Sequence, residues 1–79
     1  MPEKQRFVGK DHFINKLRDL NFTFNRPGAR VELWRQRGTG NIISVPRRDR
    51  IPETHVRFSL HQCGCGKSEI DAFISAAKS

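Results

Sequence analysis

Apolar side chains recur with a helical period near the start of the chain. Between Lys10 and Leu20 they stand at Phe13, Ile14, Leu17 and Leu20. This i, i+1, i+4, i+7 spacing is typical of an amphipathic helix that buries one face. Asn21 follows as a residue that favours the end of a helix. The pattern therefore predicts a helix over Lys10–Leu20, and we expect residues 1–9 to form a flexible N-terminal tail.

After this helix the pattern changes to the alternation of β-strands. Residues 22–24 predict a short strand, and residues 25–28, Asn-Arg-Pro-Gly, have the composition of a turn. From Arg30 to Arg35 the chain alternates, with Val31 and Leu33 on one face and Arg30, Glu32 and Trp34 on the other. Residues 36–40 predict a hairpin connection, and residues 41–45 predict a third strand that ends at Pro46. We expect an antiparallel meander with one face open to solvent or ligand.

The last third of the chain returns to a helical period. Pro52 suits the first position of a second helix, and Gly64 suits the left-handed residue that ends it. The apolar stripe of that helix is formed by Val56, Leu60 and Cys63. In a final short helix, Ser68 and Asp71 have the spacing of a capping box, and the inward positions are Ile70, Phe73 and Ile74. Helices on one face of a three-stranded antiparallel sheet bury all these stripes economically, so we expect a single α+β domain over residues 10–79.

Composition excludes several classes of protein. A chain of 79 residues with two cysteines lacks the disulfide framework of a small secreted domain. No apolar run is long enough to span a bilayer, and the polar N-terminus does not lead into a signal peptide. Cys63 and Cys65 have no second pair of ligands at the spacing of a zinc site. We therefore expect a cytoplasmic protein with no metal, no cofactor, no membrane association and no small-molecule substrate.

Charge gives the strongest functional signal. The formal net charge is +7 and the isoelectric point is about 10.5, which favours an anionic polymer as partner. All cations between residues 26 and 57 are arginines, and the lysines lie toward the two ends of the chain. The guanidinium group binds phosphate and stacks on bases, so the pattern predicts binding of nucleic acid, RNA rather than DNA. The alternative is a basic surface that only solubilises the protein.

Two local arrangements of arginine suggest where a nucleic acid binds. If the strand alternation holds, Arg30 and Trp34 share an open sheet face, where they can stack on unpaired bases. Gly28, in the preceding turn, lets the backbone approach a phosphate closely. Each arrangement has an ordinary structural alternative, because Trp34 can instead pack on Arg35, a loop or a partner protein, and the turn can be a simple hairpin turn. The candidate nucleic-acid-binding residues are Arg26, Gly28, Arg30, Trp34, Arg35, Arg37, Arg47, Arg48, Arg50 and Arg57.

The three histidines are the side chains that exchange protons near neutral pH. We expect His12 on the surface of the first helix. Arg57 and His61 lie one turn apart on the second helix, away from its apolar stripe, and add to the basic surface. His55 lies near the start of that helix, beside the arginines of residues 47–50, where an anion is favoured. His55 and His61 are therefore the candidate catalytic residues.

The chain resembles the HicA toxin family, which has a double-stranded-RNA-binding-like (dsRBD-like) fold with the order helix, three-strand meander, helix. The resemblance covers roughly residues 10–64. It rests on Gly28-Ala29-Arg30 where the family has a G-S-H turn, on Val45-Pro46 at the end of the third strand, and on residues 54–64 in place of a helix reading G-T-L-R-x-I-L-x-Q-A-G. Members of the family are metal-independent ribonucleases that cut mRNA and are silenced by an antitoxin, HicB.

The sequence departs from this family at the position of its essential histidine, which is occupied by Arg30. A guanidinium stays protonated and cannot serve as a base, although it can bind phosphate. The resemblance therefore implies an RNA-binding HicA-like module, of toxin–antitoxin type, whose nuclease centre is degenerate or rebuilt. One alternative is an active ribonuclease that uses His55 or His61 as its base. Another is a basic docking module for an acidic, antitoxin-like protein.

Overall fold

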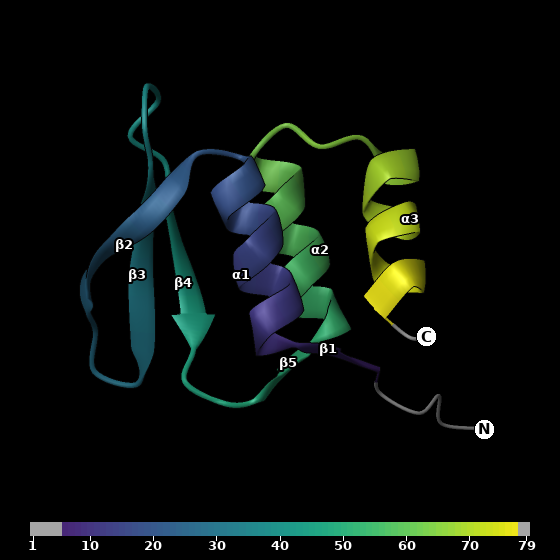
Figure 1. Ribbon diagram of the computed structural model, residues 1–79, viewed down its shortest axis with the longest axis horizontal. Helices are drawn as coiled ribbons and strands as arrows, with labels where there is room; N and C mark the ends of the chain where they lie inside the picture. Colours follow the sequence, from purple (N-terminus) through teal and green to yellow (C-terminus); the bar gives the residue numbers. More distant parts are fainter. Residues whose placement is uncertain (1–5, 78–79) are drawn as a thin grey trace.

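The computed structural model describes residues 6–77, and Figure 1 shows their arrangement. The elements follow the order β1 (Phe7–Gly9), α1 (Lys10–Asp19), β2 (Phe22–Pro27), β3 (Val31–Gln36), β4 (Ile42–Pro46), β5 (Arg50–Pro52), α2 (Glu53–Gln62) and α3 (Lys67–Ala77). Strands β2, β3 and β4 form an antiparallel meander, and β1 and β5 form a separate two-stranded sheet. The α+β fold, with helices on one side of a three-stranded antiparallel sheet, is as the sequence predicts.

The elements lie in layers in Figure 1, with the meander on the left, α1 and α2 in the middle and α3 on the right. Helix α1 buries Phe13 and Leu17 completely and packs Ile14 and Leu20 against the same core, as its apolar stripe predicts. The helix ends at Asp19, and Asn21, the expected stop residue, follows with a left-handed φ of 70°. The core thus fills the space between the sheet and the helices.

The face of β3 that points inward is the opposite of the predicted one. Trp34 is only 5% exposed, and it lies across from the buried Ile43 of β4. Successive side chains of a strand point to opposite faces, so Val31 and Leu33 lie on the outer face. The prediction that Trp34 is exposed beside Arg30 is therefore wrong. Tryptophan gains more by burial than valine or leucine, provided that its N–H finds a hydrogen-bond partner, and Glu32 supplies that partner at 3.3 Å.

The turn between β2 and β3 comes later than expected. Strand β2 continues to Pro27, with a bulge between Phe24 and Arg26, so residues 25–27 belong to the sheet rather than to a turn. The turn begins at Gly28, whose N–H donates to the Val31 carbonyl at 2.8 Å. A Cβ atom at Gly28 would lie 3.0 Å from Cγ2 of Val31, so even alanine fits there only if Val31 shifts. The second hairpin connection is as predicted, with Gly38 and Gly40 at positive φ.

Residues 7–9, predicted as part of a flexible tail, form strand β1. Val8 is 1% exposed and pairs with Ile51 of β5, so the hydrophobic side chain anchors this segment in the core. The carbonyl of Arg6 also accepts a hydrogen bond of 2.8 Å from the Glu53 N–H at the start of α2. The domain therefore begins before residue 10. The remainder of the predicted tail, residues 1–5, lies outside the described residues.

The two C-terminal helices follow the prediction except at their starts. Helix α2 buries Val56 and Leu60, packs the half-buried Cys63 at its end, and is followed by Gly64 at a φ of 88°. Pro52 precedes the helix rather than forming its first residue. Helix α3 begins at Lys67, so Ser68 is already its second residue and the predicted capping box with Asp71 does not form. Its inward stripe of Ile70, Phe73 and Ile74 is confirmed.

Candidate nucleic-acid interface

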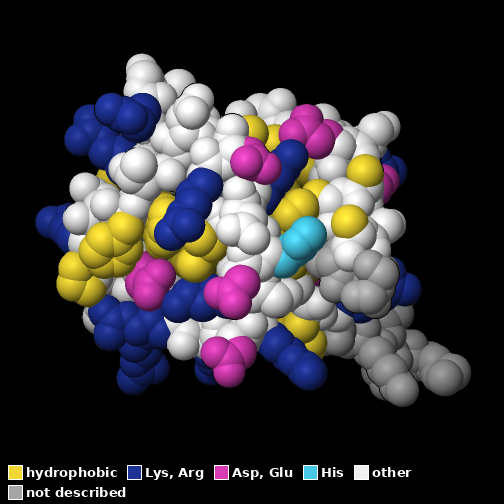
Figure 2. Space-filling model, viewed as in Figure 1, with side chains coloured by type: hydrophobic (Ala, Val, Ile, Leu, Met, Phe, Trp, Pro, Cys, Tyr) yellow, Lys and Arg dark blue, Asp and Glu magenta, His cyan; other side chains and the backbone are white. Residues whose placement is uncertain are grey.

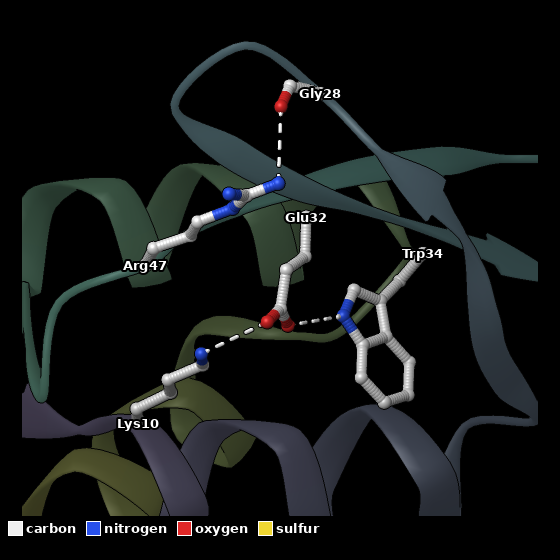
Figure 3. A network of polar contacts seen from close by, with 5 residues as sticks. All are labelled: Lys10, Gly28, Glu32, Trp34 and Arg47. Atoms are coloured by element: carbon white, nitrogen blue, oxygen red, sulfur yellow. Dashed lines mark hydrogen bonds and ion pairs between the residues drawn. The ribbon is translucent and has the colours of Figure 1, made fainter.

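Two arginine-bearing loops meet at one end of the meander. Val31 pairs with Pro46, so the β2–β3 turn and the β4–β5 loop leave the sheet side by side. A guanidinium nitrogen of Arg47, Nη2, donates a hydrogen bond of 3.2 Å to the Gly28 carbonyl, which ties the two loops together (Figure 3). The predicted glycine turn and the predicted arginine loop are thus parts of one surface.

This surface is rich in cations without counter-ions. We call it the arginine end, and it consists of Arg26, Arg30, Arg47, Arg48 and Arg50, all exposed. Within residues 6–77, ion pairs involve only Lys10, Lys16 and Arg57 among the cations, so none of these five arginines is paired. Asp49 lies in the same loop but forms no ion pair with a described residue. Figure 2 shows lysine and arginine side chains projecting from the sheet side of the molecule.

The carboxylate of Glu32 accepts hydrogen bonds from Lys10 of α1 and from the buried Trp34. Figure 3 shows it between Lys10 of α1 and the indole of Trp34. Lys10 Nζ donates to Oε2 at 3.1 Å, and Trp34 Nε1 donates to Oε1 at 3.3 Å. The hydrogen bond from Lys10 is the largest influence that lowers the pKa of Glu32, and the charge of Arg47 adds to it. Glu32 therefore stays ionised, and its charge is balanced chiefly by Lys10.

Arg35 and Arg37 are separated from the arginine end by the length of the sheet. Arg35 pairs with Thr23 and Ile42 near the second hairpin connection, and Arg37 lies within that connection. Both side chains are exposed, and neither forms an ion pair with a described residue. The candidate residues of the meander thus divide into two groups, one at each end.

Arg57 does not belong to the free basic surface. Its Nε lies 2.9 Å from Glu53 Oε2 and its Nη1 lies 2.7 Å from Asp71 Oδ1. These carboxylates, of which Asp71 has the larger effect, raise the pKa of the Arg57 guanidinium. This side chain therefore links α2 to α3, and its contribution to nucleic-acid binding stays a prediction.

The exposed aromatic ring of the sheet is Phe24, which sequence reasoning missed. Its side chain is 50% exposed on the outermost strand, and its ring packs edge-on against Trp34 with centroids 6.0 Å apart. The guanidinium carbon of Arg18 lies 5.9 Å from the centre of the Trp34 ring. A cleft of about 390 Å³ opens here, and Arg37 forms another part of its wall. The alternation of Phe22 and Phe24 was the sole signal in the sequence, and it suggests burial for both.

The candidate catalytic histidines lie in different environments. His55 is half-buried, with Nε2 2.7 Å from the carbonyl oxygen of Ser44. A carbonyl only accepts hydrogen bonds, so Nε2 bears the proton and Nδ1 of the neutral ring is left as an acceptor. His61 is exposed, and its side chain has no hydrogen-bond partner among the described residues. His12 is less exposed than predicted, because its ring stacks on Phe73 at 4.4 Å.

The cysteines are free thiols that belong to the packing of the C-terminal helices. Cys65 is buried, and Cys63 donates from Sγ to the Ser59 carbonyl at 3.2 Å. Burial is the main reason why the pKa of Cys63 rises to about 11, so its reactive thiolate form is scarce near neutral pH. Residues 6–77 contain no group of three His, Cys, Asp or Glu side chains that could hold a metal ion.

Other known proteins give no further guide to this surface. No family model matches the chain, and no curated protein and no solved structure matches it significantly. Among the described residues, no helix has both the length and the apolar character needed to cross a membrane.

Proposed function

We propose that this protein binds RNA through the arginine end. The observation that supports the proposal best is the contact between Arg47 and the Gly28 carbonyl. It joins the two loops that, with the strand residues Arg26 and Arg50 beside them, carry the five exposed arginines of the arginine end. None of these arginines is paired with a carboxylate among the described residues. Unpaired guanidinium groups attract phosphates, and each phosphate contact releases counter-ions from the nucleic acid.

The fold supports RNA rather than DNA as the polymer. The order helix, three-strand meander, helix is that of the dsRBD-like fold, which the resemblance to the HicA toxin family also implies. On this proposal the protein is a HicA-like module in which Arg30 replaces the catalytic histidine. Arg30 is exposed within the arginine end, where its guanidinium can bind a phosphate. It cannot take the proton of the neighbouring 2′-hydroxyl, as the histidine of that family would.

A salt titration tests the proposal directly. Fluorescently labelled RNA is titrated with protein at several salt concentrations, and the binding constant is plotted against salt on logarithmic scales. We expect tight binding at low salt and a steep loss of affinity as salt rises. Arg48→Gln should weaken binding and reduce the slope by about one unit if this side chain contacts a phosphate.

Lys67→Gln is the matched control. Lys67 is also exposed and unpaired among the described residues, but it lies at the start of α3 and outside the arginine end. Lys67→Gln removes one positive charge, as Arg48→Gln does, but at a site outside the arginine end. It should therefore leave both the RNA affinity and the salt slope close to the wild-type values. Absence of binding at low salt, or an equal effect of the two substitutions, would contradict the proposal.

A further inference from the structure

The cleft beside β2 has a floor of aromatic rings and walls that include cations. It lies between the end of α1 and the outermost strand of the meander, and its lining includes Arg18, Asn21, Phe22, Phe24, Trp34 and Arg37. Its volume of about 390 Å³ falls in the lower part of the range for small-molecule sites. None of the residues that line the cleft belongs to the arginine end, so it is a separate site.

Phe24 provides the aromatic surface for a ligand. Half of its side chain is open to solvent, while the edge-on contact with the buried Trp34 limits how far its ring can move. Because β2 is an edge strand, no further strand covers Phe24 on its outer side, and part of its ring stays in contact with water. A flat aromatic ligand that stacks on Phe24 removes that surface from water, and a nucleobase is such a ligand.

Arg18 and Arg37 add positive charge to the same cleft. The guanidinium of Arg18 lies over the Trp34 ring, a geometry in which the ring holds the cation while its N–H donors remain available. Neither arginine forms an ion pair with a carboxylate within residues 6–77. An anionic group can therefore bind here without displacing an existing partner.

Hydrogen bonds join the two segments of the chain that contain these arginines. The Arg37 N–H donates to the Asn21 carbonyl at 2.9 Å, and Gln36 Nε2 donates to the Leu20 carbonyl at 2.8 Å. These bonds fasten the end of β3 to the end of α1, which contains Arg18. The cleft is thus preformed, which lowers the entropy cost of binding a ligand.

We propose that this cleft binds a single unpaired nucleotide of the RNA, with the base against Phe24 and the phosphate near Arg18 and Arg37. The choice of RNA as the source of the nucleotide rests on the proposed function. Bases within a duplex are stacked and paired, so only single-stranded or looped RNA can place a base in the cleft. The cleft therefore makes the protein prefer unpaired RNA, while the arginine end binds phosphates of either form.

The test compares single-stranded and duplex RNA of the same sequence. Trp34 is the sole tryptophan of the chain and lines the cleft, so its fluorescence reports on occupancy without a label. We expect single-stranded RNA to change this fluorescence and to bind more tightly than the duplex. Phe24→Leu should reduce affinity for single-stranded RNA by roughly tenfold, the loss typical of one stacking contact, and should leave duplex binding unchanged.

The matched control is Phe58→Leu, because Phe58 is also exposed, at 64%, but lies on α2 away from the cleft. Arg18→Gln should lower the affinity for single-stranded RNA more than the affinity for the duplex. If Phe24→Leu and Phe58→Leu both bind single-stranded RNA like the wild type, while Arg48→Gln weakens it, the cleft proposal is wrong and the arginine end stands.

Adenosine 5′-monophosphate separates the failure of the two proposals. The nucleotide should shift the NMR signal of the Trp34 indole N–H, and inorganic phosphate at the same concentration should shift it much less. If the protein binds the nucleotide but no RNA, the nucleotide site in the cleft is supported and the proposal that the arginine end binds RNA is wrong. No shift with the nucleotide, or an equal shift with an acidic peptide such as polyglutamate, would overturn the nucleotide site.

Discussion

The indole nitrogen of Trp34 donates a hydrogen bond to the carboxylate of Glu32, two residues earlier on the same face of β3. The other oxygen of that carboxylate accepts from Lys10 of α1, so a charged side chain fixes the central strand to the first helix (Figure 3). A buried N–H and a partly buried carboxylate would each be costly without these partners. The inward orientation of Trp34 therefore depends on Glu32.

Replacing Glu32 by glutamine should destabilise the fold. Glu32→Gln keeps the shape of the side chain but removes the charge that pairs with Lys10 and strengthens the bond from Trp34. We expect the free energy of unfolding to fall by about 1 kcal/mol, measured by urea denaturation. Asp49→Asn is the control, because Asp49 is exposed and forms no ion pair with a described residue. Equal losses in the two variants would show that the Glu32 network does not stabilise the fold.

Stability should also decrease in acid because of the same carboxylate. The hydrogen bond from Lys10 lowers the pKa of Glu32 in the folded protein below the ordinary value of 4.5. A group whose pKa is lowered by folding stabilises the protein above its unfolded pKa, and this contribution disappears as pH falls through the folded pKa. Urea midpoints should therefore fall as pH is lowered through and below about 4.5. Glu32→Gln should show a shallower fall, and an unchanged pH profile would contradict this assignment.

Substitution of Arg57 should lower stability but not RNA affinity, and substitution of Arg48 should lower RNA affinity but not stability. Arg57→Gln breaks two ion pairs that join α2 to α3, and because the side chain is 38% exposed we expect a loss of less than about 1 kcal/mol. RNA affinity should change little. Arg48→Gln should leave the urea midpoint unchanged and weaken RNA binding. Urea denaturation and the salt titration of both variants check this contrast. If Arg57→Gln weakens RNA binding as much as Arg48→Gln does, the contrast is wrong.

The protein should bind RNA without cutting it. In the proposed resemblance to the HicA toxin family, Arg30 takes the place of the catalytic histidine, and a guanidinium cannot accept the proton of a 2′-hydroxyl. Incubation of purified protein with RNA in a chelator should therefore leave the RNA intact, as judged by gel electrophoresis. Arg30→His tests whether the base alone is missing, and slow cleavage by this variant would show that the remaining site is functional.

His55 offers the main route by which this expectation can be wrong. Its ring is oriented by the Ser44 carbonyl, and its Nδ1 is then the free acceptor of the neutral ring. Cleavage by the wild type that disappears in His55→Asn would establish a rebuilt nuclease centre. Cleavage that disappears only in His61→Asn would place the base at the exposed end of α2 instead.

Helical stripes and glycine positions allowed most of the fold to be predicted. Phe13 and Leu17 mark the inner face of α1, Gly64 marks the end of α2, and Gly38 and Gly40 mark the second hairpin, because each pattern has one dominant physical reading. The pairing of Arg57 with Glu53 was also open to prediction from their i, i+4 spacing.

The orientation of β3 could not be predicted from alternation alone. Both faces of the strand contain apolar residues, Val31 and Leu33 on one and Trp34 on the other, so the decision depends on contacts distant in sequence. Glu32 can face the helices because Lys10 pairs with its carboxylate there. Lys10 lies 22 positions away in the sequence, so the strand pattern alone does not reveal this contact. The aromatic cleft was missed for the same reason, since Arg18, Phe24 and Trp34 come together only when Trp34 points inward.

The pairing of β1 with β5 has a consequence for the way the chain folds. Val8 pairs with Ile51, 43 positions later in the sequence, and we expect such a distant contact to form late because a long loop must first be closed. Helix α1 and the meander can begin to form from local contacts, but the N-terminal strand has no partner until residues 50–52 have been synthesised. During translation we therefore expect the hydrophobic side chain of Val8 to stay without its partner strand until residues 50–52 have left the ribosome.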